Sequence, residues 1–194
     1  MLSALPLGFR FAEQPELLVC HSSQNGADAA LCEQEFPRGR ISEIYGPRSS
    51  ARTTLAHSVL AASTERGECA ALIDTANAFD ICSAAAARVK LEKLLWIRCG
   101  GNAEHALRAA DLLLQAGGFG VVALDLIDAS PQSLARIPPT AWFRFRRAIE
   151  PTPTVFLVLA DKPLTKTCAA KRVALERKKP VFAGQAPFKI LKAG

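Results

Sequence analysis

Short apolar runs alternate along the chain with segments in which apolar residues recur at helical spacing. Cys69–Asp74 is a continuous apolar run that ends in an acid, and Gly120–Leu126 is the most apolar of the runs. Runs of this length without alternation predict strands that are covered on both faces of a sheet. Between them, Glu104–Gln115 places apolar residues at positions 107, 110, 113 and 114, which predicts an amphipathic helix.

The same pattern places the other elements of the core. Further strands are expected at 40–45, 94–99 and 154–160, and helices at 53–66, 83–89 and 134–149, the last after a break at Pro138-Pro139. This alternation predicts a three-layer α/β sandwich, in which a mostly parallel central sheet lies between helices and the crossovers are right-handed. Ligands of such sheets bind at the carboxyl ends of the strands.

The two ends of the chain follow different patterns. Residues 1–35 have weak periodicity and are expected to form a helical or irregular segment, with helical pieces at 13–20 and 27–36. Residues 36–194 are expected to form the core domain. Turn signals at Lys179-Pro180 and Gly184-Gln185 predict short antiparallel C-terminal strands that close the sheet.

Positive charge is concentrated at the C-terminal end. Of the 194 residues 49% are hydrophobic and 22% charged, which excludes wholesale disorder. The net charge is +6, and residues 151–194 hold nine Lys and Arg against two acids, so the whole excess lies there. A basic end on a neutral body predicts an anionic partner, either nucleic acid or an acidic protein surface, with a solvated tail as the alternative. The candidate contact residues are Arg144, Arg146, Arg147, Lys171, Arg172, Arg177, Lys178 and Lys179.

Aromatic and basic residues interleave in Trp142–Arg147, and two interpretations are open. In one, the aromatic rings stack on bases while the arginines neutralise phosphates. In the other, an amphipathic helix turns Trp142, Phe145 and Ile149 inward and its arginines outward. The helical spacing of the aromatic residues favours the second.

Other features bear on the compartment. No apolar run reaches the ~18–20 residues of a membrane span. Met1–Phe11 does not look like a secretory signal, because no positive charge precedes its apolar stretch and Pro6 interrupts it. The six cysteines, at 20, 32, 69, 82, 99 and 168, lack metal-binding spacing, so we expect small buried hydrophobes in a reducing cytoplasm and no membrane partner.

The segment Gly46–Thr53 follows a predicted strand and opens a predicted helix. That is the setting of the phosphate loop G-x-x-x-x-G-K-[ST], in which backbone N–H groups cradle phosphates, the Lys reaches the terminal phosphates and the hydroxyl holds magnesium. Gly46 and Thr53 match this pattern, whereas Ala51 replaces the second Gly and Arg52 replaces the Lys. A Cβ restricts the backbone, and a guanidinium is not equivalent to an ammonium, so we expect weakened nucleotide binding and no fast hydrolysis.

The surroundings of this loop resemble bacterial RecA. Phe36–Leu55 is similar to the nucleotide-loop segment of RecA, and Leu72–Asp80 is similar to the RecA stretch Ile-Asp-Ala-Glu-His-Ala-Leu-Asp. Glu104–Leu107 and Val121–Asp125 resemble the next helix and the Walker B strand, in the same order. The resemblance covers roughly residues 36–176 and implies a RecA-like P-loop fold. It implies a vestigial nucleotide site at Gly46, Ser49, Ser50, Ala51, Arg52, Thr53, Thr54 and Asp125.

The resemblance also indicates which catalytic and DNA-binding parts are missing. In the RecA family the acid of Asp-Ala-Glu-His orients the attacking water, and the matching position here is Ala76, followed by Asn77. Asp125 either supports magnesium through a water or caps a loop as a strand-terminal acid. We therefore assign no catalytic residue and no metal ligand, and expect no cofactor beyond ATP with magnesium held without hydrolysis. RecA proteins grip single-stranded DNA with two mobile loops, and the corresponding intervals, 125–154 and 162–167, are short.

Taken together, these features resemble the ImuA family of RecA-related accessory proteins in bacterial translesion synthesis. The resemblance implies a damage-induced, non-hydrolysing protein that binds RecA or a relative of the Y-family polymerases, with the basic C-terminus as a candidate docking surface. The charge of the C-terminus makes single-stranded DNA a further candidate ligand. Two alternatives are a SulA-type inhibitor of cell division and a weak RecA-like ATPase or recombinase paralogue.

Overall fold

The central sheet is six-stranded and parallel throughout. In this computed structural model, residues 17–21, 33–177, 181–183 and 190–192 are described. The strands lie in the order β5-β4-β6-β7-β3-β8, and every neighbouring pair is parallel. Their bounds are β3 (Ile41–Tyr45), β4 (Cys69–Asp74), β5 (Leu94–Arg98), β6 (Phe119–Asp125), β7 (Val155–Ala160) and β8 (Ala169–Ala174).

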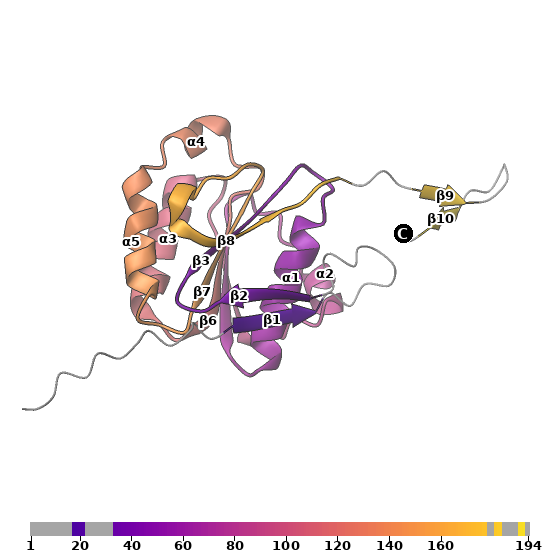
Figure 1. The fold of residues 1–194 in the computed structure, drawn as a ribbon, viewed down its shortest axis with the longest axis horizontal. Helices are drawn as coiled ribbons and strands as arrows, with labels where there is room; N and C mark the ends of the chain where they lie inside the picture. Colours follow the sequence, from indigo (N-terminus) through magenta and orange to yellow (C-terminus); the bar gives the residue numbers. More distant parts are fainter. Residues whose placement is uncertain (1–16, 22–32, 178–180, 184–189, 193–194) are drawn as a thin grey trace, which may run out of the picture.

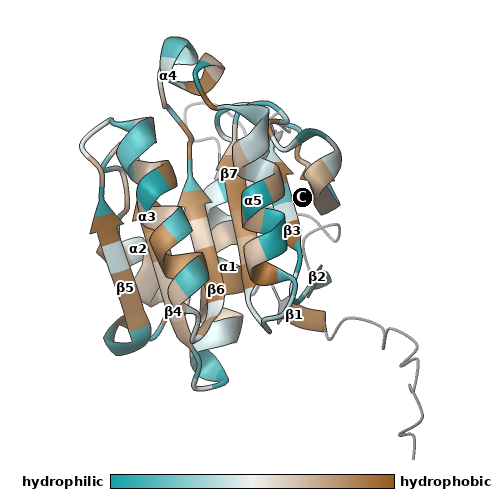
Figure 2. Cartoon of the chain, turned by 90° about the vertical axis from the view of Figure 1, so that its left-hand side faces the viewer, coloured by the Kyte–Doolittle hydropathy of each residue, from teal (hydrophilic) through white to brown (hydrophobic). Residues whose placement is uncertain are grey.

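Helices cover both faces of this sheet, as the three-layer prediction requires. The long helices α1 and α3 lie on opposite faces, with α2 beside α1 and α5 beside α3 (Figure 1). The view onto the second face shows α3 and α5 in front of strands whose residues are mostly hydrophobic (Figure 2). The bounds are α1 (Arg52–Glu65), α2 (Ile81–Ala86), α3 (Ala103–Ala116), α4 (Pro131–Ala135) and α5 (Pro139–Ile149), with short 3₁₀ turns η2 (Leu91–Lys93) and η3 (Lys166–Cys168).

Alternate residues of each strand supply the two halves of the core. In β7, for example, Val155 and Leu157 pack toward α1, whereas Phe156 and Val158 pack toward α5, and all four are fully buried. Burial of such a side chain stabilises the fold by about 1.5–3 kcal/mol relative to its exposed state. Burial on both faces explains why the strands appear in the sequence as unbroken apolar runs.

Helix α5 has the inward face that its spacing predicts. Trp142, Phe145 and Ile149 are buried, and the ring centroids of Phe145 and Phe156 lie 5.4 Å apart in a T-shaped arrangement. Pro139 stands at the first position of the helix, where a missing N–H leaves no bond unmade. The predicted helix 134–149 is in fact two helices, α4 and α5, because the Pro138-Pro139 pair separates them.

The predicted helical pieces at 13–20 and 27–36 are wrong where the structure describes them. Residues 17–21 and 33–36 belong to an antiparallel pair, β1 (Leu17–His21) and β2 (Glu33–Pro37). Leu18 and Phe36 are cross-strand partners, and both are fully buried in the cluster on the α1 side. Cross-strand and tertiary packing decided the structure of these short apolar runs, whose pattern does not separate helix from strand. Residues 13–16 and 22–32 lie outside the described part.

The closure of the sheet also differs from the prediction. Its last strand, β8, runs parallel to β3, and the predicted antiparallel strands form a separate pair, β9 (Val181–Ala183) and β10 (Ile190–Lys192). The connection from β7 crosses back over the sheet, because the carboxylate of Glu43, in the middle of β3, accepts hydrogen bonds from Leu164 N (2.5 Å), Thr165 N (3.0 Å) and Thr165 Oγ1 (2.8 Å). A buried acid thus holds the chain in a crossover that eight residues can span.

The helix expected at 83–89 begins earlier, at Ile81, because the Asp80 carboxylate caps it by accepting from the N–H groups of Cys82 and Ser83. The expectation of buried cysteines is correct for Cys99 and Cys168 and wrong for Cys69 and Cys82, which are exposed. Within the described part of the chain, no helix has both the length and the apolar character needed to cross a bilayer. That part also contains no cluster of three or more His, Cys, Asp or Glu suited to a metal ion.

Candidate nucleotide site

The loop Gly46–Thr53 joins the carboxyl end of β3 to the start of α1, as predicted. A Cβ added at Gly46 would lie 2.2 Å from the carbonyl oxygen of Leu175, so no side chain fits without movement of the backbone after β8. The Leu175 N–H donates to the Tyr45 carbonyl at 2.8 Å. Packing against the end of β8 therefore requires a glycine at position 46, the first position of the loop pattern.

Two non-glycine residues of the loop have left-handed backbone. Ser49 has φ 61° and Ala51, at the position of the second Gly, has φ 64°. A Cβ in this region is unfavourable by roughly 1–2 kcal/mol. Between these residues, the Ser50 hydroxyl is buried and has no hydrogen-bond partner among the described atoms. The loop therefore turns through two left-handed residues, neither of which is a glycine.

The side chain of Arg52 points toward β7. Its side chain is only 5% exposed, and Nη1 donates to the Ala160 carbonyl at 2.9 Å and to the Asp161 carboxylate. Both acceptors stand at the end of β7, the strand beside β3 in the sheet. The charge that replaces the Lys of the phosphate-loop pattern is thus neutralised within the protein.

A small cavity of about 100 Å³ lies between α1 and the ends of β6 and β7. Its lining includes Thr53, His57, Asp125 and Asp128, so the predicted hydroxyl and the predicted strand-terminal acid face one space. Thr53 is exposed, and Thr54 is half-buried beside it. The cavity is too small for a nucleotide but is of the size that a few water molecules fill.

Burial perturbs two of the titratable groups that line this cavity. Desolvation raises the pKa of Asp125 to about 7, and the nearby Asp74 carboxylate raises it further, against the Ile127 N–H, which donates to Oδ1 at 2.8 Å, and the Arg52 charge. Desolvation lowers the pKa of His57, and the Asp80 charge partly opposes this change. Asp125 therefore favours its protonated form more than an exposed aspartate does, and its carboxylate caps the turn after β6 by accepting from Ile127 N.

The end of β4 has a structural role. The Asp74 carboxylate accepts from Ala78 N (3.1 Å), Phe79 N (3.0 Å) and the Trp96 indole N–H (3.2 Å). Ala76 and Asn77 stand in the turn that Asp74 organises, and Asn77 Oδ1 accepts from Gly100 N at 3.4 Å. Neither side chain supplies a carboxylate that could orient a water.

The sequence did not reveal two ion pairs that link the loop to its surroundings. Arg48 is 2.5 Å from Asp128, which follows β6, and Arg52 pairs with Asp161, which follows β7. Both acids stand just beyond the carboxyl ends of core strands. Ligands and functional residues gather at these ends, and this position is the signal in the sequence that could have identified the two acids. Together the two ion pairs connect the loop to the segments that follow β6 and β7.

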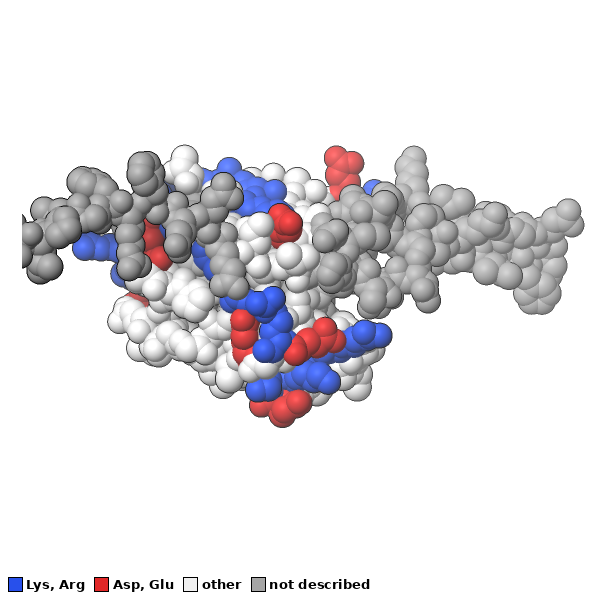
Figure 3. Space-filling model, turned by 60° about the horizontal axis from the view of Figure 1, so that its bottom comes forward, with Lys and Arg blue, Asp and Glu red and all other residues white. Residues whose placement is uncertain are grey.

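Some of the candidate contact residues are engaged by other groups of the protein. Arg144 donates to Asp111 at 2.8 Å and Arg172 to the buried Glu43 at 3.2 Å, whereas Arg146, Arg147 and Arg177 are exposed. Lys171 donates to the Glu35 carbonyl at 2.5 Å, and Lys178 and Lys179 lie outside the described residues. On the surface drawn in Figure 3, basic and acidic side chains lie side by side.

Comparison with known proteins agrees with this geometry. The family model of the RecA N-terminal domain matches residues 4–135. The RecA protein of Porphyromonas gingivalis is 39% identical over 114 residues, covering 59% of this chain and 33% of that protein. The RecA protein of Bacteroides thetaiotaomicron is 37% identical over 127 residues, covering 66% and 38%. The chain spans about a third of the length of these curated relatives.

Among solved structures, the crystal structure of the RadB recombinase superposes with a TM-score of 0.51 at 16% identity. The superposition covers 64% of this chain and 62% of that one. This likeness concerns the fold.

Proposed function

The chain belongs to the RecA N-terminal domain family, and from this premise we propose that it is a non-hydrolysing RecA-like accessory protein of the bacterial DNA-damage response. It acts by binding proteins in translesion synthesis, namely RecA or a relative of the Y-family polymerases. Single-stranded DNA is a further ligand, bound through the basic residues of the C-terminal end.

The observation that carries this proposal is the position of Arg52. A P-loop cation accelerates phosphoryl transfer by stabilising the charge that develops on the phosphate oxygens. Arg52 is buried, and its guanidinium is engaged by Ala160 and Asp161. Removing it from these partners would leave a buried carbonyl and a carboxylate unpaired, which costs about 1–3 kcal/mol for the hydrogen bonds alone.

The residues fit magnesium and ATP only in part. Thr53 and Asp125 line one cavity and are the residue types that support magnesium beside a nucleotide. Against this, the pKa of Asp125 is raised to about 7, Ala51 has a Cβ where the loop curls, and Arg52 is paired elsewhere. When bound, magnesium ATP would supply a polarised terminal phosphate, but position 76 offers no carboxylate to orient a water against it.

Phosphate release from ATP tests the proposal. The purified wild-type protein should release no phosphate above background, with or without single-stranded DNA, and Thr53→Ala should not change this. Turnover that Thr53→Ala abolishes would instead support the weak ATPase, which is favoured by the shared cavity of Thr53 and Asp125.

Nucleotide binding gives a second readout at the same site. Asp161→Asn removes the charge that holds Arg52, so we expect tighter binding of a fluorescent ATP analogue than in the wild type, by about threefold or more. Glu150→Gln is the matched control, because it removes the exposed carboxylate paired with Arg40, 3.0 Å away, outside this site. Equal affinity in wild type and Asp161→Asn would contradict the view that Asp161 competes with phosphate for Arg52.

A further inference from the structure

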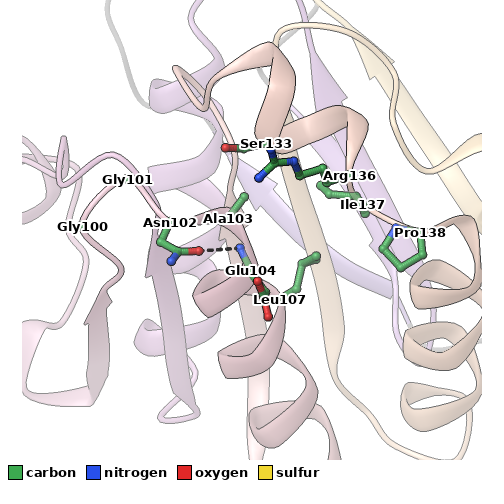
Figure 4. A pocket seen from close by; sticks show the side chains of 10 residues that line it. All are labelled: Gly100, Gly101, Asn102, Ala103, Glu104, Leu107, Ser133, Arg136, Ile137 and Pro138. Carbon is green, nitrogen blue, oxygen red and sulfur yellow. Dashed lines mark hydrogen bonds between the residues drawn. The ribbon is translucent and has the colours of Figure 1, made fainter.

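Two hollows lie on either side of the connection between α4 and α5. The first, of about 600 Å³, is lined by the start of α3 and by residues from Ser133 to Pro138 (Figure 4). The second, of about 300 Å³, lies against Trp142 and the β7–β8 crossover. Ile137 lines both, so the two hollows adjoin at this side chain, and we refer to the two together as the groove.

The first hollow is polar at its rim, and its available charge is positive. Figure 4 shows the Arg136 side chain extending over the hollow toward the start of α3. Asn102 caps α3 by accepting from Glu104 N at 2.9 Å, and the Glu104 carboxylate is 2.6 Å from Arg108. Arg136 is exposed and has no ion pair within the described part of the chain. This hollow therefore offers one cation for an anionic group.

The second hollow is apolar and has a cation at its edge. Its lining combines Leu134, Ile137, Trp142 and Leu164 with two prolines, and Lys166 is exposed at its rim. Trp142 is 3% exposed, and its ring meets Phe145 edge-on with centroids 5.9 Å apart. The site therefore suits an aliphatic or aromatic side chain, and the Trp142 ring is not free to stack on a base.

The connection between α4 and α5, which separates the two hollows, is positioned by caps and prolines of the chain itself. Pro131 begins α4, and Ser130 caps it with a hydrogen bond from Ser133 N at 3.1 Å. Pro138 and Pro139 fix the entry to α5. A preformed surface loses less conformational entropy on binding, which raises the affinity of a site of this size.

We propose that this groove binds an extended, acidic segment of a partner protein. An apolar side chain of the segment enters the hollow against Trp142, and carboxylates on either side of it pair with Arg136 and Lys166. Alternate side chains of an extended chain lie on one side of it, about 7 Å apart, so a segment of a few residues can present an apolar side chain and its flanking carboxylates to the groove together.

Single-stranded DNA suits the groove less well than such a peptide. Affinity for DNA depends on several phosphate contacts and on exposed aromatic faces. The groove has two cations, Arg136 and Lys166, and its Trp142 is buried. The inference rests on the proposed role as a protein-binding accessory, for which it names a surface and the chemistry of the partner.

Fluorescence anisotropy with defined probes tests the groove. The acidic probe is a short labelled peptide in which Asp stands two residues before and after each Leu or Phe, so that these side chains share one face of an extended chain. The basic probe carries Lys in place of each Asp, and a labelled oligothymidylate represents DNA. We expect the acidic probe to bind, and Arg136→Glu and Lys166→Glu each to weaken it about tenfold. Replacing Leu and Phe of the probe by Ser should abolish binding without any change to the protein.

Lys90→Glu is the matched control, because it reverses one exposed charge at the amino end of β5, outside both hollows. Failure of the acidic probe to bind, equal loss with Lys90→Glu, or equal binding of the basic probe would overturn the proposal. Loss of oligothymidylate binding in Arg136→Glu, with no peptide bound by the wild type, would assign the groove to DNA instead. Phosphate release by the wild type would refute the non-hydrolysing role and leave a positive peptide result standing.

Discussion

Asp125 makes the stability of the protein depend on pH in a direction opposite to that of most carboxylates. Its pKa is raised to about 7, chiefly because its position at the end of β6 removes the carboxylate from water. The folded state therefore prefers the protonated acid, whereas the unfolded chain ionises near pH 4. Asp125→Asn replaces this acid with a neutral side chain that still accepts a hydrogen bond from Ile127 N.

The size of the effect on the free energy of unfolding follows from the difference between the folded and unfolded pKa values of Asp125. Between about pH 4 and pH 7 the folded state binds more protons than the unfolded state, so this group lowers the free energy of unfolding as pH rises, and its effect levels off above the folded pKa. A change of about three in pKa corresponds to about 4 kcal/mol. Asp125→Asn should therefore become more stable than the wild type with rising pH, by about 2–4 kcal/mol at about pH 8, after allowance for local relaxation.

Urea unfolding of both proteins at about pH 4 and pH 8 measures this difference, because the two proteins differ in one titratable side chain. Glu150→Gln is the control, since it removes a carboxylate that is 56% exposed and outside this cavity, and it should change the free energy of unfolding by less than about 1 kcal/mol at either pH. A free-energy difference between wild type and Asp125→Asn that does not change with pH would refute the reasoning.

Two further substitutions probe the loop. Gly46→Ala should lower the free energy of unfolding by about 1–3 kcal/mol, because the new Cβ would lie 2.2 Å from the Leu175 carbonyl oxygen; a stability equal to the wild type in thermal unfolding would contradict this contact. Ala51→Gly should raise stability by up to about 1 kcal/mol, because glycine adopts φ 64° without strain; a loss of stability would show that the alanine methyl contributes more by packing than its backbone loses.

The sequence predicted the parallel core well because burial on both faces leaves a strong pattern. Cys69–Asp74 is a strand with the predicted bounds, and Glu104–Gln115 lies within α3. The helices predicted at 13–20 and 27–36 were wrong for a physical reason. Leu18 and Phe36 stabilise the β1–β2 pair by packing against each other and against α1. No local property of either segment reveals that contact.

The candidate site was predictable in position and not in its contacts. The pattern at Gly46–Thr53 located the loop, because a strand, a turn and a helix follow one another there. The orientation of Arg52 depends on Asp161, which is 109 residues away in the sequence. The raised pKa of Asp125 depends on the residues that bury its carboxylate. Contacts between residues so far apart in the sequence can be identified only once the strand order is known.

The direction of β8 determines where the chain leaves the domain. Because β8 runs alongside β3 in the same sense, Arg177 follows at the rim that bears the loop Gly46–Thr53. An antiparallel final strand would have delivered it to the opposite rim, about 20 Å away for a strand of this length. A fluorophore or cross-linker placed at Arg177 therefore reports on the side of the sheet that bears this loop. A fusion partner attached there would likewise obstruct that side and spare the helical flanks.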